Sequence, residues 1–370
     1  MAKDGVREMH KWLRRLKMGM LAITVGTLMT GCKILITGQE VAKQAKKKDN
    51  QILIGFSMDT LREERWQKDK AIFEQKVKEL GGDVKTLSAN GDDNLQLSQA
   101  EQLISQGVDV LVVNPHNSKT TAAIVNKAHK EGIPVIAYDR LIMNADVDLY
   151  VTFDNVKVGE LQAKAVVDHM AKESKGNMVY LGGADTDNNA KLFREGAMKV
   201  LKAEESKGKI KIVYDQYTKD WKPEEAMKNM ENALTANKNN VQGVVAANDG
   251  VAGGAIQALS AQGLVGKVPV SGQDADLAAC QRIAEGKQTM TVYKPIKSIA
   301  SKAAELAVAL AKGEKIEVKN KVHNGKINVP SVFLEPVVVT KDNLVQTVIR
   351  DGFHRMEEVY KNVPKDQWPK

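Results

Sequence analysis

The chain has 370 residues, of which 43% are apolar and only 5% aromatic. This length suits two domains of ordinary size, and the apolar content excludes a disordered chain as the default. The formal charge of +8 is concentrated at the front, because the first 31 residues carry six Lys or Arg against two acids and leave 48 bases and 44 acids elsewhere. A nucleic acid partner is therefore not indicated.

The first 31 residues are predicted to form an export signal. A basic stretch at 11–17 precedes an apolar run at 18–29 that is short for a permanent membrane span, and the letters TGC follow at 30–32. A cysteine directly after small residues resembles the lipobox of bacterial lipoproteins, which predicts a lipidated Cys32. An uncleaved signal anchor is the alternative, and both interpretations place the globular part outside the cytoplasmic membrane.

Residues 32–50 are predicted to form a flexible tether. The stretch GQEVAKQAKKKDN at 38–50 is polar, rich in lysine and without apolar periodicity. The second cysteine, Cys280, is predicted to be a small buried helix residue, and it has no disulfide partner if Cys32 is lipidated. The six histidines are scattered, so neither a metal site nor a cofactor is predicted.

From residue 51 onward, short apolar runs alternate with helical patterns, which predicts an α/β protein with parallel sheets. The predicted strands begin at residues 52, 83, 108, 134 and 149 in a first series and at 177, 210, 241, 268 and 290 in a second. Each series has the size of a half-sheet in a small domain. Sheets of this kind bind ligands beyond the carboxyl ends of their strands.

Nearly every predicted strand ends in Asp, Asn or Arg, and none ends in Ser with a suitable His nearby. The residues at these ends are Asp59, Arg65, Trp66, Asn114, Asp139, Arg140, Asp154, Asn155, Asp187, Asn188, Asn189, Asp215, Trp221, Asn248, Asp249, Gln273, Asp274, Tyr293 and Lys294. Taken singly, Asp and Asn at such positions are common turn formers and helix N-caps. Their concentration is what favours a binding site.

This set of residue types suits a neutral sugar. Each sugar hydroxyl both donates and accepts, so a site for it needs carboxylates, amides and guanidinium groups together. One face of a pyranose is lined by C–H bonds and packs against a flat aromatic ring. Trp66 and Trp221 would supply that apolar wall, one from each half-sheet, while Arg65 bonds hydroxyls.

Two glycine-rich pieces do not match the known phosphate-binding motifs. LGGADTDNN at 181–189 and GVAGGAIQ at 250–257 lack both the P-loop lysine and the dinucleotide glycine spacing. Gly253 and Gly254 are instead predicted to allow close helix packing. A glycosidase with a carboxylate pair such as Asp139 and Asp274 remains open, because the sequence does not give their separation.

Several longer motifs resemble one family. They are RWQKD at 65–69, AYDR at 137–140, FDNVKVGELQAKA at 153–165, DNNAKLFREGAMKVLK at 187–202, GGAIQALSAQGL at 253–264, SGQDADLA at 271–278 and TMTVYKP at 289–295. With them, the chain from about residue 51 to 355 is similar to the extracytoplasmic sugar-binding proteins of bacterial ABC transporters, and within them to the D-xylose-binding proteins.

The resemblance implies a type I periplasmic-binding-protein fold: two Rossmann-like α/β lobes with parallel sheets, joined by three chain crossings near residues 155, 293 and 331. The N-terminal lobe would hold 51–155 and 294–330, and the C-terminal lobe 156–293 and 331–370. Carried over by motif, the sugar contacts are Arg65, Asp139, Arg140, Asp187, Asn188, Trp221, Asn248, Asp274 and Lys294, and Trp66 is added as the aromatic wall.

The function implied is capture of D-xylose or a related monosaccharide by lobe closure, followed by delivery to an ABC transporter permease. The protein would stand outside the cell membrane on a lipid anchor, or in the periplasm of a cell with an outer membrane. A sugar sensor for a chemoreceptor or kinase is an alternative with the same site. A sugar-responsive repressor would need a helix-turn-helix ahead of residue 51, where a signal and a tether are predicted instead.

Overall fold

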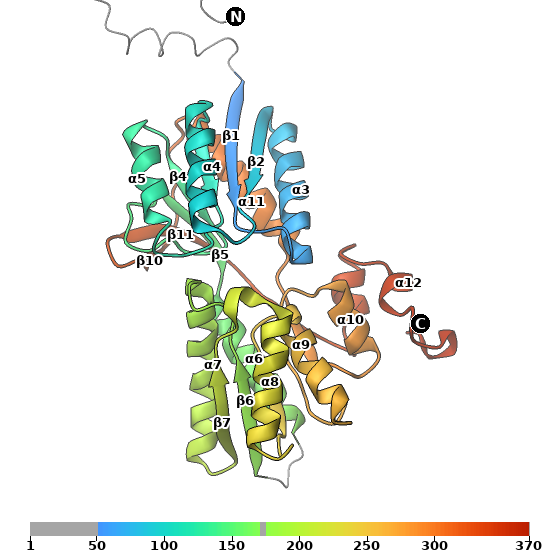
Figure 1. Cartoon of the computed structure of the whole chain (residues 1–370). Helices are drawn as coiled ribbons and strands as arrows, with labels where there is room; N and C mark the ends of the chain where they lie inside the picture. Colours follow the sequence, from blue (N-terminus) through green and yellow to red (C-terminus); the bar gives the residue numbers. More distant parts are fainter. Residues whose placement is uncertain (1–50, 171–174, 370) are drawn as a thin grey trace, which may run out of the picture. The chain divides into compact units, whose positions relative to one another are not determined.

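The computed structural model describes residues 51–170 and 175–369, and Figure 1 shows how their helices and strands are arranged. Two groups of strands, each flanked by helices, make up this part of the chain. The predicted export signal, Cys32 and the tether lie outside the described residues.

The first sheet has seven strands in the order β10-β11-β5-β4-β3-β1-β2. They are β1 (Ile52–Met58), β2 (Gly82–Ser88), β3 (Val110–Val113), β4 (Val135–Tyr138), β5 (Leu149–Phe153), β10 (Asn320–His323) and β11 (Asn328–Leu334). All pairs are parallel except β10 with β11, which form an antiparallel hairpin at one edge. The five strands predicted for the first series are therefore confirmed, and the hairpin was missed.

Helices cover both faces of this sheet, because alternate residues of its strands point to opposite sides. Val110 and Val112 of β3 pack with α3 and α11, whereas Leu111 and Val113 pack with α4 and α5. The helices are α3 (Glu64–Glu79), α4 (Asp93–Ser105), α5 (Ala122–Lys130) and α11 (Ile296–Ala311). We call the first sheet with these four helices the N-terminal lobe.

The second sheet is built around three parallel strands in the order β7-β6-β8, which are β6 (Gly176–Leu181), β7 (Ile210–Gln216) and β8 (Gly243–Ala246). Single parallel bridges from Val244 to Val270 and from Gln273 to Val292 extend it toward β9 (Met290–Tyr293). Antiparallel β12 (Val337–Thr340) pairs with β9. The strand predicted to begin at residue 268 is therefore not a continuous strand, and only Val270 and Gln273 of this segment form bridges.

Helices also cover both faces of the second sheet (Figure 1). Met178 and Tyr180 of β6 pack with α6 and α7, and Val179 and Leu181 pack with α8 and α9. The helices are α6 (Asn155–His169), α7 (Asn188–Ser206), α8 (Pro223–Ala236), α9 (Asp249–Ala261) and α10 (Leu277–Ala284). The second sheet, these helices and the C-terminal tail after β12 form the C-terminal lobe.

The tail packs beside α10 through an apolar cluster of its own. It contains η2 (Val345–Ile349), α12 (Met356–Val359) and η3 (Lys365–Gln367). Near its end, Trp368 stacks on Tyr360 with ring centroids 6.0 Å apart, and its indole N–H donates to the Val363 carbonyl at 2.9 Å. Cys280 is buried in the same cluster, as predicted.

The chain passes between the lobes three times. It leaves β5 for α6, leaves β9 for α11, and leaves β11 for β12. The third passage comes later than the predicted position near residue 331, because Leu334 still pairs with Phe153 in the first sheet. Residues 331–334 therefore belong to the N-terminal lobe, which corrects the predicted boundary.

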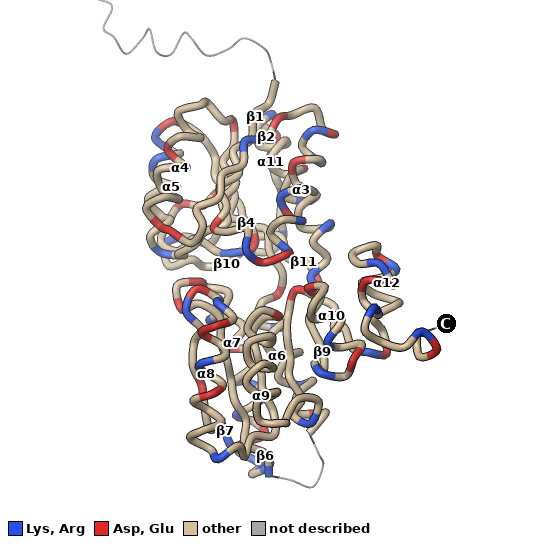
Figure 2. The backbone as a smooth tube through the Cα atoms, turned by 45° about the vertical axis from the view of Figure 1, so that its right-hand side comes forward, with Lys and Arg blue, Asp and Glu red and all other residues tan. Residues whose placement is uncertain are grey.

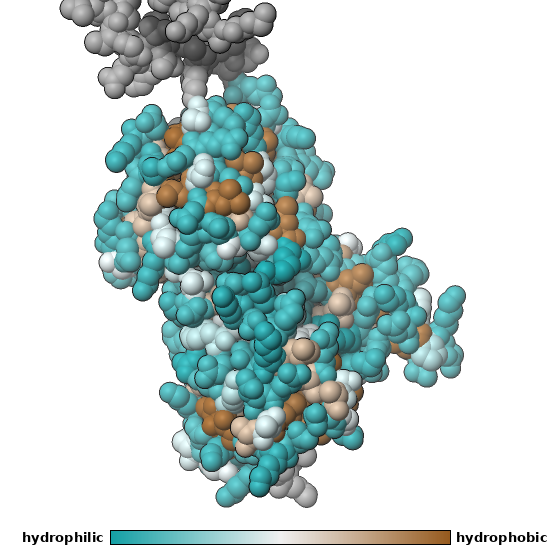
Figure 3. Space-filling view, in the orientation of Figure 1, coloured by the Kyte–Doolittle hydropathy of each residue, from teal (hydrophilic) through white to brown (hydrophobic). Residues whose placement is uncertain are grey.

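Charges of both signs are interspersed along the elements in Figure 2, with no large region of one sign. The face drawn in Figure 3 is mostly hydrophilic, and its hydrophobic residues form separate small patches. Among the described residues, only Leu95, Phe333 and Val337 are large hydrophobic residues that count as exposed. Such isolated residues are normal for a globular surface.

Helices α8 and α9 approach closely at Gly254. A Cβ atom there would lie 2.1 Å from the Pro223 carbonyl oxygen, whereas one on Gly253 would meet nothing nearer than Arg282 Nη1 at 3.5 Å. The prediction that glycine allows close helix packing is thus confirmed for Gly254 and wrong for Gly253. We expect Gly254→Ala to lower the free energy of unfolding by about 1–3 kcal/mol, because the backbone of α8 must move.

Gly253→Ala is the matched control, since it changes the adjacent residue of the same helix. It should raise the free energy of unfolding by about 0.5–1 kcal/mol, because alanine replaces glycine in a helix without a clash. Urea denaturation of both variants measures the difference. Equal effects in the two variants would contradict the account of the α8 and α9 contact.

Candidate functional site

A cleft of about 300 Å³ lies where the carboxyl ends of the strands of both lobes meet. It is lined by Glu63, Arg65, Trp66, Asp139, Arg140, Asp187, Asn189, Phe193, Trp221, Asn248, Gln273, Asp274 and Lys294. The N-terminal lobe contributes the start of α3 and the loop after β4. The C-terminal lobe contributes the start of α7, the η1 turn (Lys219–Trp221) and the loops after β8 and around residue 273.

Nine of the ten predicted ligand-binding residues line this cleft, and Asn188 does not. Asp187 is the N-cap of α7, and its Oδ1 accepts from the backbone N–H of Asn189 at 2.8 Å. The turn that results brings Asn189 into the cleft, where its Nδ2 donates to the Asp139 carbonyl at 3.0 Å. Asn189, rather than the predicted Asn188, therefore lines the cleft.

Arg65 is the centre of the first ion-pair cluster. Its side chain is 2% exposed, and its Nη2 donates to Asp139 Oδ2 at 3.0 Å while its Nη1 donates to Asp274 Oδ1 at 3.3 Å. Asp69, one helical turn away, accepts from Nε at 3.2 Å. Lys294 Nζ lies 3.4 Å from Asp274 Oδ1 and 3.6 Å from Asp139 Oδ2. Because Asp274 comes from the C-terminal lobe, this cluster joins the two lobes.

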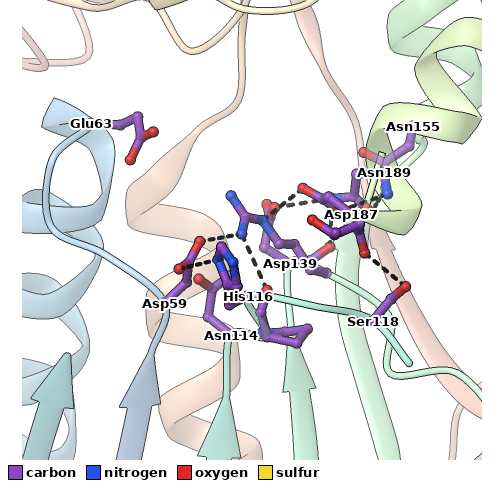
Figure 4. A network of polar contacts seen from close by, with 12 residues as sticks. Asp59, Glu63, Asn114, His116, Ser118, Asp139, Asn155, Asp187 and Asn189 are labelled. Carbon is purple, nitrogen blue, oxygen red and sulfur yellow. Dashed lines mark hydrogen bonds and ion pairs between the residues drawn. The ribbon is translucent and has the colours of Figure 1, made fainter. Parts of the chain in front are cut away.

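Arg140 is the centre of a second cluster that also joins the lobes. Its partners Asp59 and Asp187 are labelled in Figure 4. Its Nη1 donates to Asp59 Oδ2 at 2.6 Å, and its Nε lies 2.8 Å from Asp187 Oδ2 of the C-terminal lobe. Asp59 Oδ1 is 2.8 Å from Nδ1 of His116. Burial would raise the pKa of Asp59, but the His116 hydrogen bond and the Arg140 charge hold it below its usual value.

Aromatic rings line the cleft beside these charges. The guanidinium groups of Arg65 and Arg140 lie over the Trp66 ring, 4.0 and 5.2 Å from its centroid, as cation–π contacts. Trp221 meets Phe193 edge to face at 6.3 Å, and a Cβ atom on Gly183 would lie 2.0 Å from the Trp221 ring. Trp66 thus supports the arginines as well as lining the cleft, which explains why it follows Arg65.

Four non-glycine residues of the cleft region have a left-handed backbone: Asp139, Asp220, Trp221 and Asp274, with φ between 52° and 95°. Such conformations are costly and persist only where the surroundings hold them. The Asp139 carbonyl, for example, accepts from Tyr150 Oη at 3.0 Å and from Thr152 Oγ1 at 2.7 Å. The side chains of the two cleft aspartates, Asp139 and Asp274, are therefore oriented by turns with a left-handed backbone.

Sequence reasoning missed three further lining residues besides Asn189. Glu63 belongs to a stretch of mixed charge that is typical of a solvated helix start. Phe193 falls on the apolar period of α7 and looks like an ordinary core residue. Gln273 was recognised at a strand end but was not included among the contacts. Only Gln273 gave a signal that could have identified it.

Burial raises the pKa of Asp69 to about 6, although Arg65 and the Tyr138 hydroxyl favour its charged form. A raised pKa means that the folded state binds the proton more tightly than the unfolded state. Proton binding at Asp69 therefore stabilises the folded state. This contribution to the free energy of unfolding is complete below about pH 4 and is lost as the pH rises through about 6.

Between pH 4 and pH 7, wild type should therefore lose about 2 kcal/mol of unfolding free energy relative to Asp69→Asn, because Asn cannot titrate. Denaturant unfolding of both proteins across this range measures the difference. A constant difference between the two proteins would show that the pKa of Asp69 is not raised.

Comparison with known proteins decides the family. The model of the periplasmic binding protein domain matches residues 54–315. The chain belongs to the periplasmic binding protein family. The D-xylose-binding periplasmic protein of Haemophilus influenzae is 57% identical over 86% of this chain and 95% of its own length. The protein of the same description from Escherichia coli K12 is 54% identical over 90% of this chain and 98% of its own length.

A solved structure gives the same result for the fold. The carbohydrate transporter solute binding protein from Chloroflexus aurantiacus, in complex with D-glucose, is 33% identical with a TM-score of 0.78. The match covers 84% of this chain and 98% of that one. The type I periplasmic-binding-protein fold predicted from the sequence is confirmed.

Membership of the periplasmic binding protein family settles the class of function. The protein is an extracytoplasmic substrate-binding protein of a transport system and not an enzyme, which removes the glycosidase alternative. Within residues 51–170 and 175–369, no helix is long and apolar enough to span a membrane.

Proposed function

We propose that the cleft binds D-xylose and that the protein delivers this sugar to the permease of an ABC transporter. The observation that carries the proposal is a cleft whose charged side chains come from both lobes and pair across it, at Arg65 with Asp274 and at Arg140 with Asp187. The choice of xylose follows the relatives that are 57% and 54% identical and are described as D-xylose-binding.

The cleft has hydrogen-bonding capacity to spare for a sugar. Among the described residues, the Trp221 indole N–H and Gln273 Oε1 are buried without a hydrogen-bond partner. Asn248 uses its Oδ1 to cap α9 through the N–H of Val251 at 2.8 Å, which leaves its amide donors for the cleft. These donors and acceptors, together with the carboxylates, suit a ring of hydroxyls that each donate and accept.

Binding is coupled to closure of the lobes in this proposal. Outside the ion-pair clusters, Ser118 Oγ donates to the Thr186 carbonyl at 3.0 Å, and Arg62 Nη2 donates to the Asp220 carbonyl at 2.7 Å. Both bonds need the lobes together. A sugar that bridges the lobes therefore shifts the population toward the closed form, which a permease recognises. Micromolar affinity requires about −8 kcal/mol of binding free energy.

The proposal includes a lipid anchor at Cys32. The order of basic region, apolar run and TGC at 30–32 supports it, and the tether at 32–50 would let the lobes reach a permease. Cys32→Ala should abolish the incorporation of labelled fatty acid into the protein. No incorporation in the wild type would favour an uncleaved signal anchor. Signalling to a chemoreceptor or kinase stays a prediction.

Calorimetric titration with D-xylose, glucose, ribose and arabinose tests the proposed ligand. We expect a one-to-one heat with xylose that is tighter than with the other three sugars. A tighter heat with another sugar would keep the site and overturn the ligand, and no heat with any of them would overturn the proposed function.

A further inference from the structure

We propose that Asp249 is a positioning residue that sets the loop at 272–276, so that Gln273 and Asp274 face the sugar. This inference rests on the proposed function and names a residue that does not itself line the cleft. Asp249 follows the cleft residue Asn248, is 2% exposed and begins α9.

Hydrogen bonds tie Asp249 to the loop and its surroundings through its backbone N–H and both carboxylate oxygens. Its N–H donates to the Gln273 carbonyl at 2.9 Å. Its Oδ2 accepts from the N–H of Asp276 at 3.0 Å and from Thr291 Oγ1 at 2.9 Å. Its Oδ1 accepts from Gln288 Nε2 at 2.8 Å. The bonds at Gln273 and Asp276 hold the loop on either side of Asp274.

The loop also leaves room for this carboxylate. A Cβ atom on Gly272 would lie 2.0 Å from Asp249 Oδ1 and 2.4 Å from Gln288 Nε2. The carboxylate therefore occupies the space of a side chain at residue 272, and only glycine fits. The fit fixes where the loop runs immediately before Gln273.

The conformation that these bonds support is a costly one. Asp274 has a φ of 95° and Ala275 a φ of 53°, both in the left-handed region that side chains disfavour. The Ala275 N–H donates to Thr291 Oγ1 at 3.2 Å, and the same hydroxyl donates to Asp249. Thr291 thus connects the carboxylate to the strained turn. Without the carboxylate, the loop loses the bonds to the Asp276 N–H and to Thr291, and the position of Asp274 opposite Arg65 is less firmly held.

The charges around Asp249 bear on the free energy of burying its carboxylate. Arg282 Nη2 donates to the Asp249 carbonyl at 3.0 Å, and its charge lowers the pKa of Asp249, against the effects of burial and of the nearby Asp274. Burial raises the pKa of Asp249 to about 7. Burying an acid in this way has a free-energy cost, which the hydrogen bonds from Asp276, Gln288 and Thr291 to the carboxylate offset in part.

The test is a double-mutant cycle on the full chain with D-xylose as the probe, measured by calorimetry. Asp249→Asn should weaken binding by about 10- to 100-fold, because its amide N–H₂ faces donors that need an acceptor. In the Asp274→Asn background the same change should weaken binding by less than about 3-fold, since the residue acts through Asp274. A purely structural role would give the same loss in both backgrounds.

A milder variant keeps the test valid if Asp249→Asn does not fold. Thr291→Val removes the hydroxyl that links Asp249 to Ala275 and should weaken binding by about 3- to 10-fold. Asn343→Ala is the control, because Asn343 also holds a turn of the C-terminal lobe, through Thr340 N at 2.7 Å and the Val338 carbonyl at 2.9 Å. It should leave the affinity unchanged.

If Asp249→Asn and Thr291→Val both bind D-xylose with an affinity within about 3-fold of the wild type, this inference alone is overturned. The same holds if Asp249→Asn causes equal losses of affinity in both backgrounds of the cycle. Failure of the wild-type protein to bind any of the four sugars would overturn the proposed function and this inference together.

Discussion

Asp274→Ala is expected to weaken D-xylose binding by about 30- to 4,000-fold, which corresponds to about 2–5 kcal/mol. Asp274 brings a C-terminal-lobe carboxylate to Arg65 Nη1 at 3.3 Å and to Lys294 Nζ at 3.4 Å, inside the cleft. Alanine removes a sugar acceptor and also leaves two buried cations short of a partner when the lobes close. Both effects disfavour the closed, sugar-bound state.

Asp215→Ala is the control for this prediction. Asp215 also ends a strand of the C-terminal lobe and pairs with an arginine, Arg194, but the arginine side chain is 37% exposed. A pair of this exposure contributes little, so the affinity should not change and the free energy of unfolding should fall by no more than about 1 kcal/mol. Calorimetric titration of both variants makes the comparison. Equal affinities of Asp274→Ala and wild type would remove Asp274 from the site.

Trp221→Ala is expected to weaken sugar binding by about 30- to 1,000-fold, or about 2–4 kcal/mol. The indole is buried at the cleft between Gly183 and Phe193 and presents an N–H that has no partner among the described residues. Alanine removes the apolar surface for the sugar ring and this donor together. Trp221→Phe distinguishes the two contributions, because it loses the donor and keeps most of the aromatic surface, so its loss should be intermediate.

Trp368→Ala is the matched tryptophan control. Trp368 packs on Tyr360 in the C-terminal tail and its N–H is already bonded to Val363. Its removal should lower the thermal midpoint and leave sugar affinity unchanged. An affinity loss in Trp368→Ala as large as in Trp221→Ala would mean that general destabilisation, rather than contact with sugar, explains both results.

The sequence predicted the parallel core of each lobe because buried parallel strands are nearly continuous apolar runs. The runs that became β1 and β3 are short, β-branched and followed by helices. The hairpin at the edge was not predicted, since β10 reads NKVH and is mostly exposed, so it carries no such signal. The run at 268 was overpredicted because its residues form only single bridges, at Val270 and at Gln273, and no continuous ladder.

Most of the site could be predicted because ligands bind where parallel strands end, and polar residues at these ends are visible in the sequence. The sequence could not predict which of Asn188 and Asn189 lines the cleft, because this depends on the residue at which α7 begins. The N-cap at Asp187 rotates Asn189 toward the cleft, and a shift of one residue would have reversed the result. Phe193 could not be distinguished from core residues by its period alone.

The most direct test of the central claim is a crystal structure of the protein with D-xylose. We expect the sugar in the cleft, against Trp221, with hydroxyls bonded to Asp139 or Arg140 of the N-terminal lobe and to Asp274 or Asn248 of the C-terminal lobe. A sugar bound outside the cleft, or held by residues of one lobe only, would contradict the account.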